Sequence, residues 1–493
     1  MPSPLKVLFV GSECAPFSKT GGLGDVLGAL PKALARRGMD ARVVMPLYAG
    51  IPWNDLERLE GVLGVPIGHG EVRGAVRMGK LPRSEVPIYF LEHHHYYDRP
   101  YLYGPPDQSY SDNLERFTYL SRGALQLCKA LGFVPDIIHA NDWQTALVPV
   151  YVNTVEWAQP LHACASIYTI HNLAHQGVFD AGALFLTALG PQHYHPREFE
   201  HFGTMNLTKA AIYHSTLLTT VSPTYAREIQ MPIHGFGLDG VLAQRAGDLF
   251  GVLNGIDLEV WSPESDPHIA ARFSAQHPAG KLECKRALQR EAGLPVRDDV
   301  PIFGFVGRLT PQKGVDVLAQ ILRTALDLDI QIVLLGSGDP DAERFFSHIA
   351  WLRPDRFSTY IGFDNPRAHR IEAGADFFLM PSRFEPCGLN QLYSLRYGTL
   401  PIVRATGGLA DTVVQYDERS GTGTGFMFND LTPGALYNAI GWALSTWHDR
   451  PHHIEKMRVE AMNQDFSWDR SAEAYERLYH AAYARRRGHP FAR

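Results

Sequence analysis

Short apolar runs alternate with amphipathic stretches along most of this chain, and this alternation constrains the fold more than any other feature. In the first half the apolar runs are KVLFV, ARVVMP, DIIHAND, ASIYTIHN and LLTTVSP. The pattern starts again near residue 260 with VPIFGFVG, IQIVLLGSGD, STYIGF, DFFLMPS and LPIVRAT. Such alternation is typical of βαβ units that build a mostly parallel sheet. The sequence therefore predicts an α/β fold with a doubly wound domain in each half.

The length also favours more than one domain. A chain of 493 residues is too long for a single hydrophobic core, since domains average roughly 150 residues. The stretch WSPESDP, with its prolines and acidic residues, is typical of a hinge. We place the first domain at residues 1–255 and the second at 256–465, followed over 466–493 by a helix that crosses back to the first domain. Within the first domain we expect a hairpin-bearing insertion over 50–115, helices near 113–132 and 142–157, and an irregular stretch over 176–205.

Composition limits the kinds of partner that the protein can bind and the cell compartment in which we expect it. The formal net charge is −6 and no long Lys/Arg stripe is present, which argues against a nucleic-acid partner. No apolar stretch reaches the 18 or so residues that a membrane span needs. The five cysteines are widely spaced and form no CxxC pair, which favours free thiols in a reducing compartment. We therefore expect a cytoplasmic enzyme that binds neither nucleic acid nor membrane.

The segment KTGGLGDV, from Lys19 to Val26, follows the first predicted strand and has the composition of a phosphate-facing loop that enters a helix. Glycines let a backbone approach a pyrophosphate, and the helix N-terminus directs amide N–H groups toward it. The segment matches neither common template, because Lys19 precedes the glycines and the glycine spacing has one residue too many for a dinucleotide fingerprint. The alternative is a turn that only packs a helix on a sheet. A phosphate site here therefore needs residues from elsewhere in the chain.

Two cations follow the first predicted strand of the second half, in GRLTPQKG. Arg308 can hold phosphate oxygens with two hydrogen bonds, and Lys313 supplies a point charge. Together the two side chains can replace a divalent metal on a diphosphate leaving group. The sequence therefore predicts a diphosphate site at this loop.

Glu385 follows the predicted strand DFFLMPS, so it should lie at the carboxyl edge of the sheet, where open α/β folds bind ligands. A carboxylate there can accept sugar hydroxyl groups, and the amides of Cys387, Gly388 and Leu389 can face an anion. The segment from Thr406 through Gly407 and Gly408 repeats the order of strand, glycines and helix. These loops predict a nucleotide diphosphate site shared between the two domains.

In the first half, HANDW and YTIHN also end predicted strands. Asp142 and His171 are therefore candidate polar groups around a reacting sugar. The run His93-His94-His95 is not expected to hold a metal, because adjacent residues rarely converge on one ion. We expect a solvated loop there.

The motifs, taken together, resemble those of bacterial glycogen synthases, which are similar to plant starch synthases and share the glycosyltransferase B architecture. The resemblance covers nearly the whole chain, with KTGGLGDV, HANDW, TIHNLAHQG, VSPTYAREI, LNGID, GRLTPQKG, SRFEPCGLNQLYSLRYGTLPIVRATGGLADTV and FSWDRSA in the family's order. It implies two Rossmann-like, doubly wound domains that face a central cleft. It also implies glucosyl transfer from ADP-glucose to the non-reducing end of an α-1,4-glucan such as glycogen, with UDP-glucose as the alternative donor and with neither cofactor nor metal.

The resemblance also implies roles for individual residues. The catalytic set comprises Glu385, His171, Asp142, Arg308 and Lys313. The donor-binding set comprises Lys19, Gly21, Gly22, Asp25, Asn172, Asn254, Phe363, Cys387, Gly388, Leu389, Asn390, Thr406, Gly407 and Gly408.

Three positions depart from patterns common in related transferases. Asn390 stands where many relatives carry Thr, and Phe363 stands where Tyr is common, which removes a hydroxyl and keeps a ring for stacking. Tyr393 stands where the broader group of retaining transferases carries a second glutamate. The absence of that glutamate is expected within the synthases.

Two mechanisms remain open for transfer with retention. In the first, the leaving phosphate takes the proton of the acceptor 4-hydroxyl, while Arg308 and Lys313 stabilise the diphosphate and the backbone near His171 stabilises the positive sugar. In the second, a carboxylate such as Glu385 or Asp142 forms a covalent intermediate.

Three rival functions explain less of the sequence. A nicotinamide dehydrogenase would account for Gly336-Ser337-Gly338 but lacks a complete fingerprint. A non-catalytic glucan-binding protein would account for the aromatic content of 11% but not for the set of charged residues at the predicted site. A pyridoxal-phosphate phosphorylase has the same architecture, but its chain is much longer and its motifs are missing here.

Overall fold

The computed structural model describes residues 4–105 and 108–489, and this part of the chain packs as two compact units. Unit 1 contains the chain up to Val221, Ala226–Gly255 and the stretch from Trp468 onward. Unit 2 contains Ile256–Ser467 together with Ser222–Tyr225. The predicted tail over 466–493 extends into residues 490–493, which lie outside the described part.

Unit 1 is built on a 10-stranded sheet that is parallel in its centre. Seven strands run parallel in the order β13-β12-β8-β7-β1-β2-β6, and β5 adds antiparallel to β6. The strands of the unit are β1 (Lys6–Val10), β2 (Asp40–Pro46), β3 (Glu57–Arg58), β4 (Leu63–Ile67), β5 (Gly70–Lys80), β6 (Pro87–Glu92), β7 (Ile137–Asn141), β8 (Ala165–Ile170), β12 (Leu217–Thr220) and β13 (Leu249–Gly251). A separate three-stranded sheet contains β9 (Val178–Asp180), β10 (Glu200–His201) and β11 (Thr204–Asn206).

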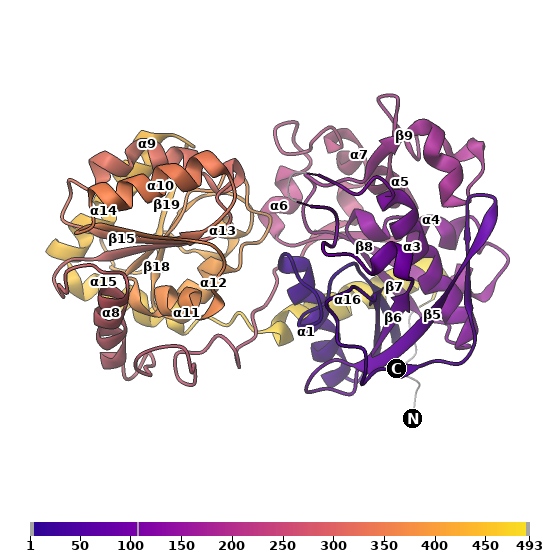
Figure 1. Cartoon of the computed structure of the whole chain (residues 1–493), viewed down its shortest axis with the longest axis horizontal. Helices are drawn as coiled ribbons and strands as arrows, with labels where there is room; N and C mark the ends of the chain where they lie inside the picture. The colour runs from indigo at the N-terminus through magenta and orange to yellow at the C-terminus, as the bar shows by residue number, and fades with distance from the viewer. Residues whose placement is uncertain (1–3, 106–107, 490–493) are drawn as a thin grey trace. The chain divides into compact units, whose positions relative to one another are not determined.

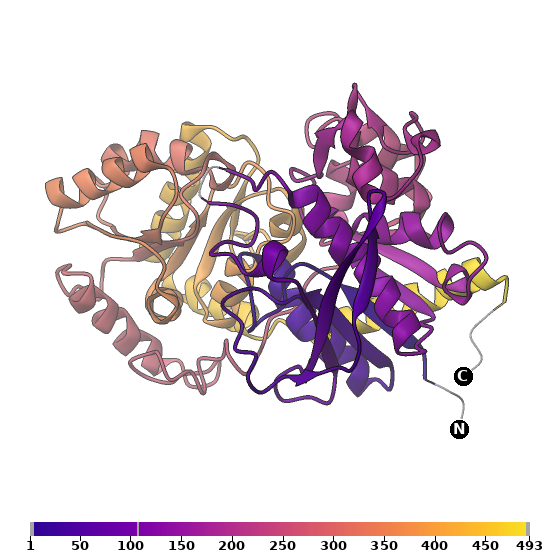
Figure 2. The same ribbon diagram turned by 45° about the vertical axis from the view of Figure 1, so that its right-hand side comes forward.

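The helices of unit 1 include one from the far end of the chain. They are α1 (Gly22–Arg36), α2 (His94–Tyr97), α3 (Asn113–Ala130), α4 (Leu147–Asn153), α5 (Leu207–His214), α7 (Asp239–Gln244) and α16 (Trp468–Arg487), while α6 (Pro223–Glu228) has residues in both units. Figures 1 and 2 show α16, in yellow, running along the indigo and purple elements of this unit. Its Tyr479 is fully buried and hydrogen-bonds through its hydroxyl to His139 Nδ1 on β7, at 2.8 Å. Arg37, just after α1, pairs with Glu476 of α16 at 2.6 Å. The final helix is therefore an integral part of unit 1.

Unit 2 is built on a six-stranded parallel sheet. Its strands are β14 (Ile302–Val306), β15 (Gln331–Gly336), β16 (Phe357–Ile361), β17 (Phe377–Met380), β18 (Leu400–Arg404) and β19 (Phe426–Phe428). They lie in the order β16-β15-β14-β17-β18-β19, which is the doubly wound order 3-2-1-4-5-6 of a Rossmann fold. The order reverses between β14 and β17, so a ligand site is expected outside the carboxyl ends of those two strands.

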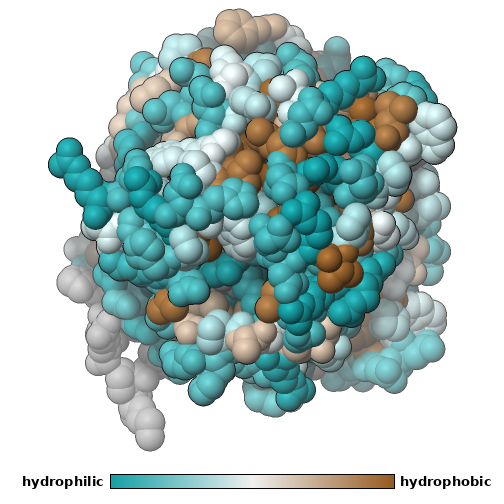
Figure 3. Space-filling model, turned by 90° about the vertical axis from the view of Figure 1, so that its left-hand side faces the viewer, coloured by the Kyte–Doolittle hydropathy of each residue, from teal (hydrophilic) through white to brown (hydrophobic). Residues whose placement is uncertain are grey.

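Helices cover both faces of this sheet, as Figure 1 shows. They are α8 (Ala279–Glu291), α9 (Val315–Ala325), α10 (Pro340–Leu352), α11 (Asn365–Gly374), α12 (Asn390–Arg396), α13 (Gly407–Thr412), α14 (Pro433–Asp449) and α15 (Pro451–Met462). The apolar faces of α9, α10 and α14 pack with strand residues in one buried cluster, and α8 and α11 pack in a second. Figure 3 shows one outer face of unit 2 as mostly hydrophilic, with smaller hydrophobic areas.

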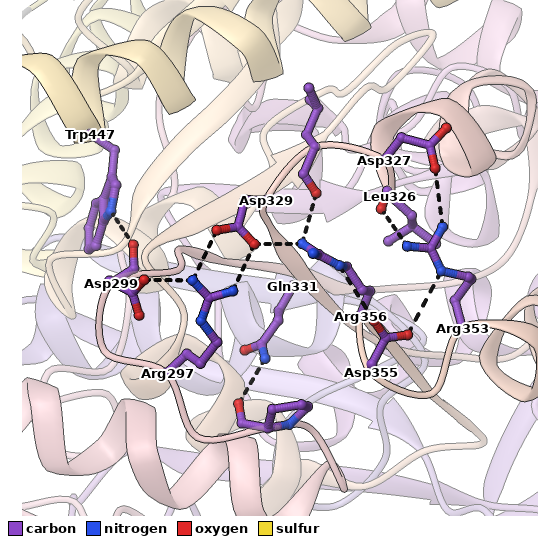
Figure 4. A network of polar contacts seen from close by, with 12 residues as sticks. Arg297, Asp299, Leu326, Asp327, Asp329, Gln331, Arg353, Asp355, Arg356 and Trp447 are labelled. Carbon is purple, nitrogen blue, oxygen red and sulfur yellow. Dashed lines mark hydrogen bonds and ion pairs between the residues drawn. The ribbon is translucent and has the colours of Figure 1, made fainter.

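An ion-pair network lies at the amino ends of β14, β15 and β16 (Figure 4). Arg297 donates to both carboxylate oxygens of Asp329, at 2.9 and 3.0 Å, and also to Asp299 at 2.6 Å. Arg356 donates to Asp329 at 2.7 Å. These charges neutralise one another at the end of the sheet away from the predicted site. Because the pairs form a network with two-point contacts, they contribute more to stability than isolated surface ion pairs do.

Several predicted elements are confirmed and some are shorter than expected. The helix predicted near 113–132 is α3, and the insertion over 50–115 contains the antiparallel strands β4 and β5. The helix predicted over 142–157 is shorter: a 3₁₀ turn at Trp143–Thr145 is followed by the seven-residue α4, which ends at Asn153. His93 accepts a hydrogen bond from Tyr96 N and caps α2, so this part of the His run is a helix start instead of a loop.

No helix within residues 4–105 and 108–489 has the length and apolar character that crossing a membrane requires.

Candidate active site

The cationic loop of unit 2 leaves the carboxyl end of β14, and the loop that carries Glu385 leaves the neighbouring β17. Lys313 ends a 3₁₀ turn over Pro311–Lys313, directly before α9. Its Nζ donates to Glu385 Oε2 at 2.6 Å, and Ser382 Oγ donates to the same oxygen at 3.0 Å. The two loops thus meet within unit 2, at the topological switch point of its sheet.

Burial makes the pair of Lys313 and Glu385 unusual. The side chain of Glu385 is 6% exposed and that of Lys313 is 22% exposed. A buried carboxylate is costly unless a cation and further donors satisfy it. Lys313 and Ser382 supply those donors and leave Oε1 of Glu385 with no hydrogen bond among the described contacts. One carboxylate oxygen therefore remains for a hydroxyl group of a ligand.

Gly314 explains why this cation lies so close to the carboxylate. The residue adopts a φ of +69°, and a Cβ built on it would lie 1.9 Å from the carbonyl oxygen of Pro381. Both observations require glycine at this position. The turn before α9 can therefore pack directly on the chain that follows β17, which brings Lys313 within reach of Glu385.

A second pair of close contacts fixes the Glu385 loop. Gly408 N donates to the carbonyl of Glu385 at 3.0 Å. A Cβ on Gly407 would lie 2.0 Å from that carbonyl, and a Cβ on Gly408 would lie 2.0 Å from the carbonyl of Cys387. Thr406, which precedes them, is fully buried. These glycines thus hold the backbone of the Glu385 loop in place.

The amides of this loop are partly available. Neither Gly388 N nor Leu389 N donates a hydrogen bond to any described residue, whereas Gln391 Nε2 donates to the carbonyl oxygens of Cys387 and Gly388 at 2.9 and 3.0 Å. Gly388 has a φ of +71°. Asn390, in contrast, donates through Nδ2 to the carbonyl of Val306 at 2.6 Å, so this amide group binds the end of β14. Two backbone donors, and not the Asn390 amide nitrogen, remain for an anion.

The remaining predicted residues of unit 2 are exposed. Arg308 is exposed, and within the described part of the chain its guanidinium makes one hydrogen bond, a long one of 3.4 Å to Gln312. Phe363, just after β16, is 90% exposed. An exposed guanidinium and an open ring are what a diphosphate and a nucleobase would need to bind.

The glycine loop of unit 1 differs from the sequence-based expectation. Glu13, 3% exposed, accepts hydrogen bonds from Thr20 N at 2.7 Å, Gly21 N at 3.2 Å and Thr20 Oγ1 at 2.6 Å. Tyr103 donates its hydroxyl to the same carboxylate at 2.6 Å. Two amides of this loop, those of Thr20 and Gly21, are therefore occupied by a carboxylate of the chain itself. The sequence analysis missed Glu13, because nothing in its spacing shows that it folds back on the loop.

Other features of this loop agree better with a ligand site. Lys19 Nζ pairs with Asp25 Oδ1 at 2.7 Å, and the lysine side chain is 46% exposed. Gly21 adopts an extended backbone, and a Cβ on it would meet no atom within 4 Å. The fold therefore gives no steric reason for glycine at position 21. Gly22 is the first residue of α1.

Asp142 and His171 lie together at the carboxyl ends of β7 and β8. Asp142 has a φ of +57°, a strained conformation for a residue other than glycine, of the kind that is found at functional sites. Its Oδ1 accepts the backbone N–H of His171 at 2.7 Å and that of Asn172 at 3.5 Å. Burial raises the pKa of Asp142 to about 7, although these hydrogen bonds act in the opposite direction.

The ring of His171 is neutral and held in one orientation. Burial lowers its pKa to about 3. Asn141 Nδ2 donates to the carbonyl oxygens of Val10 and His139, both at 3.1 Å, so its Oδ1 faces His171 Nε2 at 3.0 Å as an acceptor. This network assigns the proton to Nε2 and leaves Nδ1 as an acceptor. Asn141, which sequence analysis did not single out, thus positions His171.

Asn254 is the last predicted donor residue of unit 1. It is 6% exposed, and its Oδ1 is buried without a hydrogen-bond partner among the described residues. A buried acceptor without a donor is costly, which indicates a water or ligand partner.

Within the described ranges no group of three or more His, Cys, Asp or Glu is arranged to hold a metal.

Comparisons with known proteins cover both halves. Residues 6–244 match the family described as starch synthase catalytic domain, and residues 289–459 match glycosyl transferases group 1. The chain is 51% identical over 488 residues to glycogen synthase 1 of Geobacter metallireducens, which covers 98% of this chain and 97% of the relative. It is 50% identical over 485 residues to a glycogen synthase of an Anaeromyxobacter species, covering 97% and 100% of the two chains.

Solved structures agree with this family. The catalytic domain of starch synthase IV from Arabidopsis thaliana, bound to ADP and acarbose, matches with a TM-score of 0.90 and 34% identity, over 98% of this chain and 100% of that one. Sucrose-phosphate synthase from Thermosynechococcus elongatus matches with a TM-score of 0.59 at 18% identity, over 97% and 99%, which supports the fold alone. The chain therefore belongs to the family of bacterial glycogen synthases and plant starch synthases, and has the glycosyltransferase B architecture.

Proposed function

We propose that this protein transfers a glucosyl group from ADP-glucose to the non-reducing end of an α-1,4-glucan, with retention of configuration and release of ADP. The observation that carries the proposal is the buried pair of Lys313 and Glu385 beside two available backbone amides at the switch point of unit 2. The family membership supports the same reaction class.

The cations account for departure of the nucleotide. When the bond between glucose C1 and the β-phosphate oxygen breaks, negative charge collects on the diphosphate. Lys313 is held in place by Glu385, and Arg308 is free to close on the phosphate oxygens. A cation held in place, as Lys313 is, stabilises a leaving group with little reorganisation, and Arg308 adds its charge when it closes. The two cations do the work that a divalent metal does in other transferases.

The acceptor side needs no protein base. The 4-hydroxyl of the glucan forms its bond to C1 on the face that the diphosphate leaves, and its proton passes to the leaving phosphate oxygen. Glu385 accepts a sugar hydroxyl through Oε1, and neutral His171 accepts one through Nδ1. The carbonyl of His171, which accepts no hydrogen bond within the described part of the chain, supports the positive charge at the sugar.

A covalent intermediate is the alternative mechanism, with Glu385 or Asp142 as the nucleophile. Each carboxylate already has one oxygen engaged: Glu385 Oε2 by Lys313 and Ser382, and Asp142 Oδ1 by the amide of His171. These contacts favour the mechanism without a protein nucleophile. Mass spectrometric trapping of a glucosyl-enzyme with a slow fluorinated donor would contradict it.

ADP-glucose is the proposed donor over UDP-glucose. The Arabidopsis starch synthase structure contains ADP, and the exposed ring of Phe363 offers a stacking surface that suits a purine. The test is to incubate the protein with glycogen and either donor, and to measure release of the nucleoside diphosphate and incorporation of glucose. We expect ADP release with an α-linked product. No ADP release would contradict the proposed function, and faster UDP release would contradict the donor.

A further inference from the structure

The turn between β10 and β11 holds a phenylalanine in a backbone conformation that the residue disfavours. His201 and Thr204 pair across the two strands, so Phe202 and Gly203 form a two-residue hairpin loop. Their φ angles are +51° and +81°. Positive φ at both central positions defines a type I′ turn, for which Asn-Gly is the preferred sequence. Gly203 fits this rule and Phe202 does not.

Phenylalanine at that position costs stability. Its Cβ clashes with the backbone at positive φ, and strained residues of this kind persist where function retains them. The surroundings hold the turn, since Gly203 N donates to Glu200 Oε1 at 3.1 Å and Thr204 Oγ1 donates to the carbonyl of His201 at 2.7 Å. Folding therefore gives no reason for an aromatic ring here, because Asn would form the same turn more readily.

The ring of Phe202 is also open to solvent. It is 85% exposed, and its only ring neighbour within the described part of the chain is His201, with centroids 4.5 Å apart. A fully open aromatic side chain gains nothing from burial, so it does not contribute to the core. The strained turn therefore keeps an aromatic ring exposed on the surface.

A neighbouring turn repeats the arrangement. Phe236 has a φ of +48° and precedes Gly237, whose φ is +84°. A Cβ on Gly237 would lie 3.2 Å from His201 Nε2 and 3.8 Å from the ring of Phe202, so this glycine lets the two turns meet. Gln176 Nε2 donates to the carbonyl of Phe236 at 3.0 Å and fixes the second turn. Two adjacent turns of unit 1 thus place phenylalanine where glycine or asparagine is preferred.

The chemistry around the ring suits a neutral, hydroxyl-rich ligand. Burial, followed by the charge of Lys209, lowers the pKa of His201, so its imidazole is uncharged at neutral pH. The ring of Phe202 offers a flat apolar face, and the imidazole nitrogens beside it can exchange hydrogen bonds with hydroxyl groups. Pyranose units present this combination of an apolar face and a polar rim.

We propose that the turn at His201–Gly203, together with Gly237, is a glucan-binding site that holds a segment of the α-1,4-glucan chain against the ring of Phe202. The inference rests on the proposed function for the identity of the polymer. It adds a binding site for the acceptor that does not involve the catalytic residues of either unit.

The test uses the full chain with Phe202→Asn, which restores the preferred turn residue and removes the ring. We expect a higher Tm than in the parent protein, because the strain is relieved. Affinity electrophoresis in gels containing glycogen, without any donor, should show glycogen binding weakened by roughly fivefold to tenfold, the loss of one aromatic contact. The KM for glycogen should rise by a similar factor, while the KM for ADP-glucose stays that of the parent. A variant that keeps the ring, Phe202→Tyr, should bind glycogen as the parent does.

Trp157→Ala is the matched control, because Trp157 is 72% exposed in unit 1 and has no positive φ. Its glycogen binding should equal that of the parent. The proposal is overturned if Phe202→Asn binds glycogen normally, if Trp157→Ala loses as much binding, or if Phe202→Asn instead changes the oligomeric state, which would make the turn a protein contact. Absence of turnover in the parent, with glycogen binding that still depends on Phe202, would overturn the proposed function and leave this site standing.

Discussion

The two units have the same strand order around their switch points and opposite chemistry at them. In unit 2 the loops after β14 and β17 bring Lys313 to Glu385, and the amides of Gly388 and Leu389 have no acceptor among the described residues. In unit 1 the loop after β1 donates the amides of Thr20 and Gly21 to the carboxylate of Glu13. One glycine-rich turn is open to an anion, and the other already contains one.

The difference shows that a glycine loop entering a helix is not by itself a phosphate site. What decides is whether the chain supplies its own acceptor for the amides, and that acceptor can lie on the preceding strand end, as Glu13 does. The diphosphate is therefore expected at unit 2. Unit 1 itself carries Lys19, a neutral imidazole and a strained carboxyl group.

The largest expected effect comes from Lys313→Ala. It removes a fixed cation from the leaving group and leaves Glu385 buried without its partner, so we expect turnover to fall by about 2–4 kcal/mol of transition-state stabilisation. Steady-state kinetics with ADP-glucose and glycogen measures this. Lys313→Ala should also lower the stability of the protein, and the double variant Lys313→Ala/Glu385→Gln should recover much of that loss, because it leaves no unpaired buried carboxylate. A near-normal rate for Lys313→Ala would remove the lysine from the mechanism.

Asp142→Asn tests the strained carboxyl group of unit 1 through the pH dependence of stability. Since the folded pKa of Asp142 is raised from 3.8 to about 7, its contribution to stability is present below pH 4 and is lost as the pH rises through 7. The parent should therefore lose unfolding free energy relative to the variant over this window, on the order of 3 kcal/mol. Urea unfolding of both proteins across the pH range measures the difference. Parallel curves would show that the carboxyl group ionises normally.

Glu13→Ala would break the contrast between the loops. The amides of Thr20 and Gly21 would lose their acceptor, and we expect a loss of about 2 kcal/mol in stability. Inorganic phosphate should then stabilise the variant more than the parent in thermal unfolding, because the loop has become an empty anion site. Tyr103→Phe, which removes one hydrogen bond and keeps the carboxylate, serves as the control. Equal phosphate effects in all three proteins would refute the idea that Glu13 fills the site.

Lys19→Ala should have the smallest effect. Its ion pair with Asp25 is exposed, so stability should change by less than about 1 kcal/mol. The expected result is a raised KM for ADP-glucose with an unchanged KM for glycogen. A change in the glycogen KM alone would assign Lys19 to the acceptor.

Sequence patterns predicted much of this arrangement, and the reason lies in local signals. Apolar runs and glycine turns predicted β14, β17 and the loops after them, and predicted that Glu385 follows the carboxyl end of a strand. The contact between Lys313 and Glu385 was not predicted. The roles of Glu13 and Asn141 were not predicted, because they depend on partners such as Tyr103 and His171, which are distant in the chain. Only the packed fold shows which buried polar group satisfies which donor.

The position of α16 has a consequence for biosynthesis. This helix supplies Tyr479 to the interior of unit 1, yet the ribosome makes it after all of Ile256–Ser467. Unit 2 therefore has its whole sequence available first, whereas the sheet of unit 1 waits with His139 uncovered until α16 emerges. A fragment that stops at Gly255 would keep that surface exposed, so the two units cannot be separated by a single cut in the gene.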